Sequence, residues 1–501
     1  MNKNRHLFYL LLGALCTSCS SFLDPVIDPC AKREVACLRE EMWLPPPLAK
    51  EALEVLPELA ADCHPWTPAE LIDVALQNNP LTLRTWADAR AAAFNWEASK
   101  SQLYPSVNLQ ESLNFTVTKV KNSDSDSTVA STTGNTVSPS NINPTSGNGS
   151  SASGGIGYNQ RVIHNLSASY LLLDFGGRSA SIEAARHALY ASNWIHNRSI
   201  QDVIVNVLRA YYTYQQAFGL YQAELLNLQD AKVSLDSAVA QFEAGVKTHL
   251  DVLQAKTAYV NIQLALDQAL GNVKSGMGAL AAAIGTPANT TYEIEPLPEI
   301  LPIEQVTHNM EELLEYAKSS RGDLAAAYAS YRQTVSNWKV ARSAGLPIIT
   351  ANADYEWVNN IHYPSQNFSF RSGSIALQVP IFSGFLYVNQ EKQAAANVES
   401  SFADLQQAES NVLLDVVTAY YAFQTAGTAV KFSQEYLQYA EQAYEGISIG
   451  YREGTNTITD LLTLQMTVSN ARAQLVQARS GWLISLANLA YAAGSLYDCN
   501  G

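Results

Sequence analysis

The sequence predicts a mainly α-helical chain built from two copies of one unit, in which two strands lead into a very long helix. Two observations predict this fold: an internal similarity that keeps a constant spacing, and a change of apolar period within each copy, from two to that of a helix. Charged residues make up 15% of the 501 residues, below the roughly 25% usual for soluble domains. Such a composition is typical of long helices that pack closely through small side chains.

The internal similarity indicates a tandem duplication. Asn95-Trp96 matches Asn337-Trp338 at an offset of 242 residues, and the segment 210–215 matches 419–424 at an offset of 209. The offset falls because the first copy carries a longer insertion in its middle. The predicted organisation is a lipoprotein signal peptide at 1–18, an N-terminal extension at 19–65, a first repeat at 66–286, a linker at 287–310, a second repeat at 311–496 and a tail at 497–501.

The amino-terminal residues predict export. A basic start that includes Lys3 is followed by the apolar stretch 7–15, which is too short to span a bilayer but typical of a signal peptide. Small Thr17-Ser18 directly precede Cys19, as at a bacterial lipoprotein cleavage site. We therefore expect Cys19 to become the lipidated first residue, with ordinary cleavage nearby as the alternative.

The other cysteines favour disulfides over a metal site. Cys30, Cys37, Cys63 and Cys499 remain after processing, and an oxidising periplasm favours bridges between them. Four thiols allow two disulfides in three connectivities, and the sequence leaves the pairing open. No spacing typical of metal ligands accompanies these cysteines, so we expect no metal.

The first copy opens with a helix. Thr67-Pro68-Ala69-Glu70 forms a capping box with Pro at the first helical position, which predicts one helix from there to about Leu103, before Pro105. The apolar period then becomes two, which predicts two strands separated by an insertion. The apolar members of these strands are Val107, Leu109, Leu113, Phe115 and Val117, then Val162, Leu166, Ala168, Tyr170 and Leu172.

The second copy repeats the alternation and predicts two further strands. Their apolar members are Ile349, Ala351, Ala353, Tyr355 and Trp357, then Ile375, Leu377 and Val379. Apolar and polar side chains that alternate over about ten residues are typical of a transmembrane β-barrel, although a half-buried soluble sheet shows the same pattern. No later window is apolar enough for a transmembrane helix. Since four strands cannot close a barrel, a membrane role requires other copies of the chain.

A polar loop distinguishes the two copies. Residues 119–157 are rich in Ser, Thr, Asn and Gly and show no apolar period, whereas the matching segment 358–367 is short. In a barrel, strand–loop–strand units of this kind place the loop outside the cell.

After Gly176-Gly177 and Ser383-Gly384 the period is helical for about sixty residues without Pro, which predicts a helix of roughly 90 Å. The last stretch of this helix in each copy has a heptad pattern with small residues, which predicts coiled-coil packing. Its positions are Leu228, Ala231, Leu235, Ala238 and Phe242, and Leu437, Ala440, Tyr444, Ile447 and Tyr451. Gly245 and Gly454 end these helices, and a shorter helix returns from each.

Charge and motifs exclude several classes of function. A net charge of −15 argues against nucleic acid as a partner, because a phosphate backbone needs a basic surface. The sequence contains no nucleophile elbow, zinc-binding helix or dinucleotide fingerprint. We therefore expect no enzymatic activity and no cofactor.

The chain resembles the TolC-type outer-membrane factors over about residues 66–496. The resemblance is carried by the junctions 173–178 and 379–384 before the long helices, and by the turns at Gly245 and Gly454, each followed six residues later by an aspartate. It implies a homotrimer whose three chains form a twelve-stranded barrel in outer-membrane lipid, continued by a twelve-helix periplasmic tunnel.

The resemblance also implies the partners. A duct of this type is passive and receives substrate from a periplasmic adaptor and an inner-membrane pump of resistance-nodulation-division or ABC type, in efflux or type I secretion. The expected location is the outer membrane, lipid-anchored, with a large periplasmic portion. A periplasmic coiled-coil scaffold without channel activity is the alternative, but it does not explain the strands.

The same resemblance places a gate at the turns. Asp460 occupies an acidic ring position of the closed tip, and Asp251 and Tyr451 match positions that bond across neighbouring coils. Asn456 replaces a basic latch residue, and Thr463 replaces a second acidic residue. We therefore expect one carboxylate ring and a softer gate. For the two aspartates, capping of a helix N-terminus is the alternative role, and for Tyr451 it is plain packing.

Overall fold

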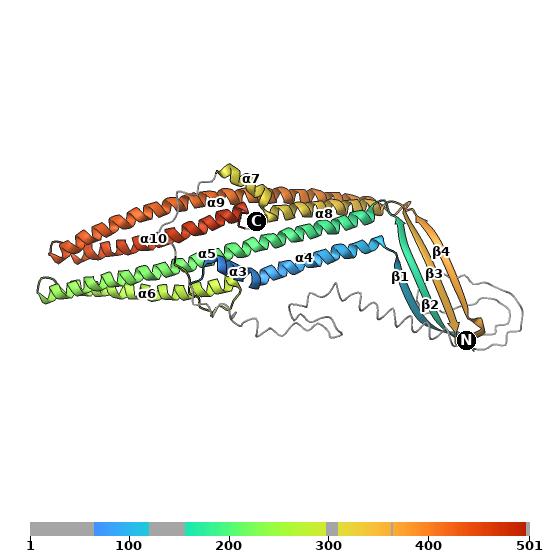
Figure 1. The fold of residues 1–501 in the computed structure, drawn as a ribbon, viewed down its shortest axis with the longest axis horizontal. Helices are drawn as coiled ribbons and strands as arrows, with labels where there is room; N and C mark the ends of the chain where they lie inside the picture. The colour runs from blue at the N-terminus through green and yellow to red at the C-terminus, as the bar shows by residue number, and fades with distance from the viewer. Residues whose placement is uncertain (1–64, 120–155, 297–308, 362–363, 497–501) are drawn as a thin grey trace.

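The computed structural model describes residues 65–119, 156–296, 309–361 and 364–496. The signal peptide, the predicted lipidation site Cys19 and all four cysteines of the disulfide prediction lie outside these residues, as does most of the polar loop 119–157. In the described part, a small sheet lies at one end of an elongated bundle of helices, and two helical hairpins end together at the opposite end (Figure 1).

The α-helices of the second copy begin 242 or 209 residues after their counterparts in the first copy. The opening helices are α3 (Pro68–Asn78) and α4 (Pro80–Ser99), and their second-copy counterparts α7 (Met310–Ser320) and α8 (Gly322–Ala344) begin 242 residues later. A short 3₁₀ helix, η3 (Lys100–Leu103), follows α4. The long helices α5 (Gly177–Glu243) and α9 (Leu386–Arg452) both have 67 residues, and the return helices α6 (His249–Ile284) and α10 (Ile458–Ala493) both have 36. The predicted duplication is confirmed.

The single opening helix expected up to Leu103 is wrong. The chain breaks at Asn79, which is extended at φ −69° and ψ 125°, and α4 begins at Pro80. The residue before a proline avoids the helical region, and Asn79 caps the new helix by accepting a hydrogen bond from the Leu81 amide at 2.9 Å. Arg321 makes the same break in the second copy at φ −75° and ψ 120°, without a proline.

The four strands form one antiparallel sheet in the order β1-β2-β3-β4. They are β1 (Ser106–Lys119), β2 (Ile156–Leu173), β3 (Ile348–Asn360) and β4 (Phe368–Gln378), with a short helix η4 (Pro364–Gln366) between the last two. Strands β2 and β3 pair across the two copies, with Leu166 opposite Tyr355. The sheet therefore joins the repeats into one unit.

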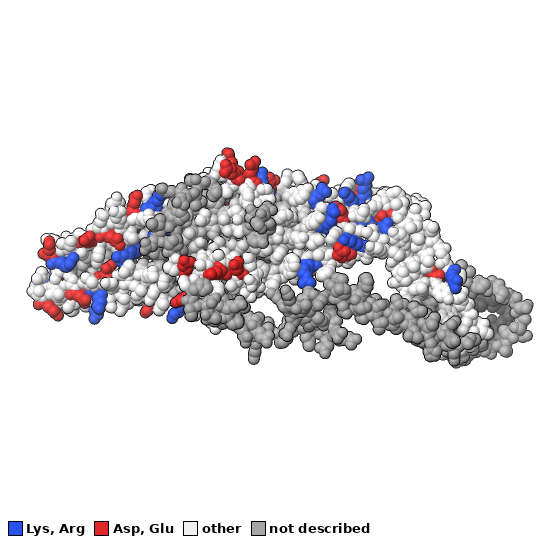
Figure 2. Space-filling model, viewed as in Figure 1, with Lys and Arg blue, Asp and Glu red and all other residues white. Residues whose placement is uncertain are grey.

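One face of the sheet is apolar and exposed, and we call it the apolar sheet face. Val107, Phe115 and Ile375 on this face expose 63%, 65% and 75% of their surface in the single chain. Figure 2 shows few charged side chains over the strands, in contrast to the helices. In the described chain, β1 and β4 each have one edge that no strand pairs with.

The two repeats bury matching cores where the opening and return helices meet. In the first repeat Val203, Val207 and Leu280 are fully buried in a cluster that also contains Leu71. The residues 209 positions further on, Val412, Val416 and Leu489, are also buried. The sequence repeat is therefore also a repeat of packing.

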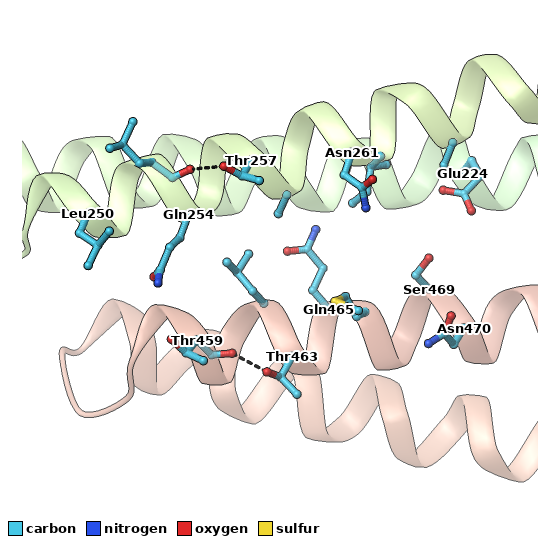
Figure 3. Close-up of a pocket in the computed structure, with 16 residues that line it drawn as sticks. Glu224, Leu250, Gln254, Thr257, Asn261, Thr459, Thr463, Gln465, Ser469 and Asn470 are labelled. Atoms are coloured by element: carbon cyan, nitrogen blue, oxygen red, sulfur yellow. Dashed lines mark hydrogen bonds between the residues drawn. The ribbon is translucent and has the colours of Figure 1, made fainter.

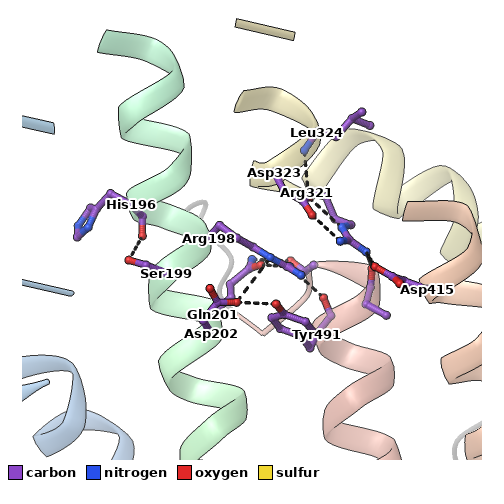
Figure 4. A network of polar contacts seen from close by, with 12 residues as sticks. His196, Arg198, Ser199, Gln201, Asp202, Arg321, Asp323, Leu324, Asp415 and Tyr491 are labelled. Carbon is purple, nitrogen blue, oxygen red and sulfur yellow. Dashed lines mark hydrogen bonds and ion pairs between the residues drawn. The ribbon is translucent and has the colours of Figure 1, made fainter. Parts of the chain in front are cut away.

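A buried polar cluster joins the repeats at mid-length (Figure 4). Arg321 exposes only 4% of its surface and donates to Asp323, to Asp415 at 3.1 Å and to the Ala492 carbonyl at 3.3 Å. Arg198 of α5 lies over the ring of Tyr491 of α10 at 3.7 Å, and the Tyr491 hydroxyl donates to Asp202 at 2.5 Å. These contacts connect α5 with the helices of the second repeat.

No described helix is both long enough and apolar enough to cross a membrane.

Candidate functional site at the helical tip

The tip is made by two turns with the same backbone. Gly245 and Gly454 have positive φ of 73° and 81°, a conformation that glycine adopts without strain. The Val246 amide donates to the Gln241 carbonyl at 2.9 Å, and the Thr455 amide donates to the Gly450 carbonyl at 2.8 Å. Both hairpins thus reverse through the same type of helix end.

Both predicted tip aspartates cap the helix that follows the turn. Asp251 Oδ2 accepts from the Thr248 amide at 2.9 Å, and Asp460 Oδ2 accepts from the Thr457 hydroxyl at 2.6 Å and its amide at 3.2 Å. The threonine hydroxyl of each pair accepts in return from the aspartate amide, so each is a complete capping box. The capping role of both residues is present in the structure.

Capping also stabilises the charged form of Asp460. Hydrogen bonds from the Thr457 hydroxyl and backbone amide lower the pKa of this carboxyl below its ordinary value of 3.8. The carboxylate is fully exposed at the tip, so its charge is available to ions in the surrounding water.

Tyr451 is packed and not free. It exposes 1% of its surface and lies in a cluster with Ala238 and Ala255 of the first repeat and with Ile458 and Leu461 of its own. Burial raises the pKa of its hydroxyl, and the charge of Asp251 adds to this effect. The hydroxyl is buried without a hydrogen-bond partner among the described residues. Within one chain, Asp251 and Tyr451 are therefore neighbours that do not bond.

A residue that the sequence analysis missed, Lys247, joins the two turns. Its Nζ donates to the Asn456 carbonyl at 3.2 Å and lies 5.2 Å from the centre of the Tyr451 ring. Gln241 adds a second link, because its Nε2 donates to the Tyr451 carbonyl at 3.2 Å. Lys247 stands 209 residues before Asn456 and is therefore its counterpart in the first repeat, so the two matching positions of the turns contact each other.

The side chain of Asn456 lies inside its own turn. A Cβ at Gly450 would come within 2.3 Å of Asn456 Nδ2 and 2.8 Å of Thr455 Oγ1. The absence of a side chain at Gly450 therefore leaves room for the Asn456 and Thr455 side chains inside the turn. Because Gln241 occupies the matching position in the first repeat, the sequence comparison did not indicate this close approach.

A second contact holds the hairpins together above the tip. Arg472 of α10 donates to Asp230 Oδ2 at 2.8 Å and Asn227 Oδ1 at 2.9 Å, both on α5. Asn227 is buried and donates to Ser469 Oγ at 2.7 Å. Opening of the tip that separates α5 from α10 must break this cluster as well as the Lys247 contact.

Thr463 lies in a groove between α6 and α10, which Figure 3 shows in close-up. Its hydroxyl donates to the Thr459 carbonyl at 2.7 Å, as Thr257 donates to the Leu253 carbonyl at 2.8 Å across the groove. The groove has a volume of about 710 Å³, and Glu224 is the one charged residue among those that line it. The position that would hold a second acidic ring thus contributes a neutral wall.

The described residues contain no group of three or more His, Cys, Asp or Glu side chains placed to hold a metal ion.

Comparison with known proteins agrees with this architecture. The family model described as "Outer membrane efflux protein" matches residues 71–286 and 313–495. Protein CyaE of Bordetella pertussis is 25% identical over 420 residues, which cover 81% of this chain and 79% of that protein. Outer membrane protein TolC of Vibrio cholerae is 24% identical over 438 residues, which cover 86% and 91%. The solved structure of the outer-membrane channel OprN has a TM-score of 0.72 at 17% identity and covers 85% of this chain and 90% of that one.

Proposed function

Because this chain belongs to the outer membrane efflux protein family, we propose that three copies of it form the passive exit duct of a tripartite efflux or secretion system. The chain is an outer-membrane efflux channel protein with a large periplasmic portion. The number of copies, the partners and the gate are the parts that we propose.

The observation that carries the proposal is the four-stranded sheet with two unpaired edges and an exposed apolar face. Lipid satisfies no backbone hydrogen bonds, so an open edge is not tolerated there, and each sheet needs neighbours on both sides. Three copies would supply twelve strands and close one barrel. A scaffold outside the membrane would leave the apolar sheet face in water without a reason.

The helical part extends the duct away from the membrane. A helix of 67 residues is about 100 Å long, and α5 and α9 each run from the sheet to the tip. The opening helices α4 and α8 pack beside them in the sheet half, and the return helices α6 and α10 in the tip half. We propose that a periplasmic adaptor and an inner-membrane pump engage at the tip and supply the substrate and the energy. Two relatives carry names that agree: the probable efflux pump outer membrane protein TtgC of Pseudomonas putida and the pyoverdine export outer membrane protein OpmQ of Pseudomonas aeruginosa.

The ring of three Asp460 carboxylates can be tested by single-channel recording in planar bilayers. Asp460 is exposed and ionised, so three copies around a narrow exit would attract cations through their summed field. We expect Asp460→Asn to reduce the preference for K⁺ over Cl⁻ and Asp404→Asn, at an exposed residue of α9 far from the tip, to leave it unchanged. An unchanged preference in Asp460→Asn channels that conduct would remove Asp460 from the pore.

A further inference from the structure

The groove between α6 and α10 contains an unsatisfied buried amide. We call it the tip groove; its walls are the segments 250–265 of α6 and 459–470 of α10, with Glu224 of α5 at one end. Gln465 lines the tip groove, exposes 5% of its surface and points from α10 toward the opposite wall (Figure 3). Its Nε2 and Oε1 are both buried without a hydrogen-bond partner among the described residues. A buried donor and a buried acceptor without partners cost free energy. A ligand that bonds both atoms of Gln465 would remove this cost, which favours binding at this point.

The side chains that line the two walls are uncharged, and Gln254, Asn261 and Asn470 add further amides. Gln465, however, is the lining residue whose donor and acceptor are both buried and unpaired among the described residues. Leu250, Leu253 and Met466 are apolar and expose 62%, 47% and 66% of their surface. The hydroxyls of Thr257 and Thr463 already donate to carbonyls of their own helices, so their hydrogens are not free to bond a ligand. A ligand that fits is uncharged, has apolar side groups, and presents one donor and one acceptor side by side to Gln465.

We propose that the tip groove binds an extended, uncharged peptide segment and that Gln465 recognises its backbone. In an extended chain, the N–H and C=O of one residue point to the same side and can pair with both atoms of a carboxamide. A helix cannot do this with its backbone, because its own N–H and C=O groups are bonded internally. The unpaired amide of Gln465 therefore favours an extended chain over a helix as the ligand.

The dimensions agree with this ligand. The α6 wall covers 15 residue steps, or about 22 Å, and the α10 wall about 16 Å. At about 3.3 Å per residue, five or six extended residues fill this length. The volume of about 710 Å³ is within the ~300–1,000 Å³ range of ligand sites. The inference does not depend on the channel activity, since it concerns a site within one chain.

The test uses the full chain purified in detergent and a fluorescent, blocked hexapeptide of alternating leucine and serine, followed by fluorescence anisotropy. We expect saturable binding, weakened about tenfold or more in Gln465→Met, which keeps the shape but removes the donor and the acceptor. Gln406→Met makes the same change at an exposed position of α9 and should leave binding unchanged. Binding that is equally strong in Gln465→Met would overturn the proposal.

A second arm does not depend on any variant. The same hexapeptide with N-methyl groups on its two central residues lacks the N–H donors and should bind at least about tenfold more weakly to the natural chain. Equal binding of the methylated peptide, or tighter binding of a helical peptide of the same residues, would contradict recognition of an extended backbone. Absence of peptide binding, with Met466→Cys forming crosslinks between chains, would show that a neighbouring copy fills the groove. Single-channel currents recorded on the same protein measure its channel activity independently of peptide binding.

Discussion

Asp460 has one observed role and one proposed role, and both require the same protonation state. As a carboxylate it caps α10 through Thr457, and as a carboxylate it would contribute charge to the proposed ring. The hydrogen bonds that cap the helix lower its pKa and thus keep the charge in place. The two roles that the sequence left as alternatives are therefore compatible in one residue.

A pH dependence follows from the direction of this pKa shift. A carboxyl whose pKa is lowered on folding contributes stability above its unfolded pKa and loses it as the pH falls through the lower, folded value. Cation selectivity should therefore stay constant from about pH 7.5 to pH 5 and decline only below about pH 4. Reversal potentials of single channels across this range check the prediction. A loss of selectivity between pH 7 and pH 5 would point to another titrating group.

Lys247 changes the expectation of a softer gate. Asn456 does lack a basic side chain, but Lys247 reaches its carbonyl from the other hairpin and covers the Tyr451 ring. Both turns belong to one chain, so this contact joins the tips of the two hairpins within a protomer.

Lys247→Met should loosen the tip. Removal of one half-buried, charge-assisted hydrogen bond costs about 1 kcal/mol, which would raise the ratio of open to closed tips roughly fivefold for each protomer of the channel. The open probability of single channels measures this ratio. Lys256→Met is the matched control, because it removes an exposed lysine of the same region whose side chain has no partner among the described residues. A similar rise in both variants would mean that net charge, and not the Lys247 contact, controls opening.

The roles of several tip residues could not be predicted from the amino-acid sequence. Lys247 bonds to the other hairpin, Gln465 is buried without a hydrogen-bond partner among the described residues, and Gly450 leaves room inside its turn. No local sequence pattern marks any of the three. On the sheet, Glu111 and His164 were absent from the predicted apolar alternation. The register places them opposite each other on the apolar sheet face, bonded at 3.0 Å, so each break in the pattern is paired with the other.

At the scale of elements, duplication made the fold largely predictable. Offsets of 242 and 209 residues locate every described α-helix of the second copy from the first. The break in the opening helix was missed because Thr67, Pro68 and Glu70 form a strong start, and apolar residues continue past Pro80. In the second copy the break lies at Arg321, a buried guanidinium paired with Asp323 and Asp415, and the sequence around Asn79 contains no equivalent ion pair. Both residues nevertheless donate to matching carbonyls of the return helix, those of Ala283 and Ala492.

The glycine that ends each return helix should be essential for this joint. Gly494 has φ of 81°, and a Cβ there would lie 2.8 Å from Ser320 Oγ and 3.3 Å from Arg321 Cγ. We expect Gly494→Ala to destabilise the chain by about 1–3 kcal/mol through backbone strain and this close approach. Gly481→Ala, inside α10 with open space around it, should instead stabilise by about 0.5–1 kcal/mol. Apparent melting temperatures that move in the same direction for both variants would contradict this account of the joint.

At the scale of the whole molecule, alternation predicted the four strands but not their pairing. Register depends on which strands meet, and β2 pairs with β3 across the two repeats, which no local signal indicates. The unpaired edges of β1 and β4 became visible only once the order of the strands was known. They are the reason why the single chain is incomplete as a membrane structure.

The central claim, that three chains complete one duct, is tested most directly by imaging the purified assembly in lipid nanodiscs by electron cryomicroscopy. The account predicts a three-fold particle in which β1 of each chain pairs with β4 of its neighbour, so that one twelve-stranded barrel encloses a lumen continuous with the helices. Particles with a different number of copies, or with β1 and β4 left unpaired, would contradict it.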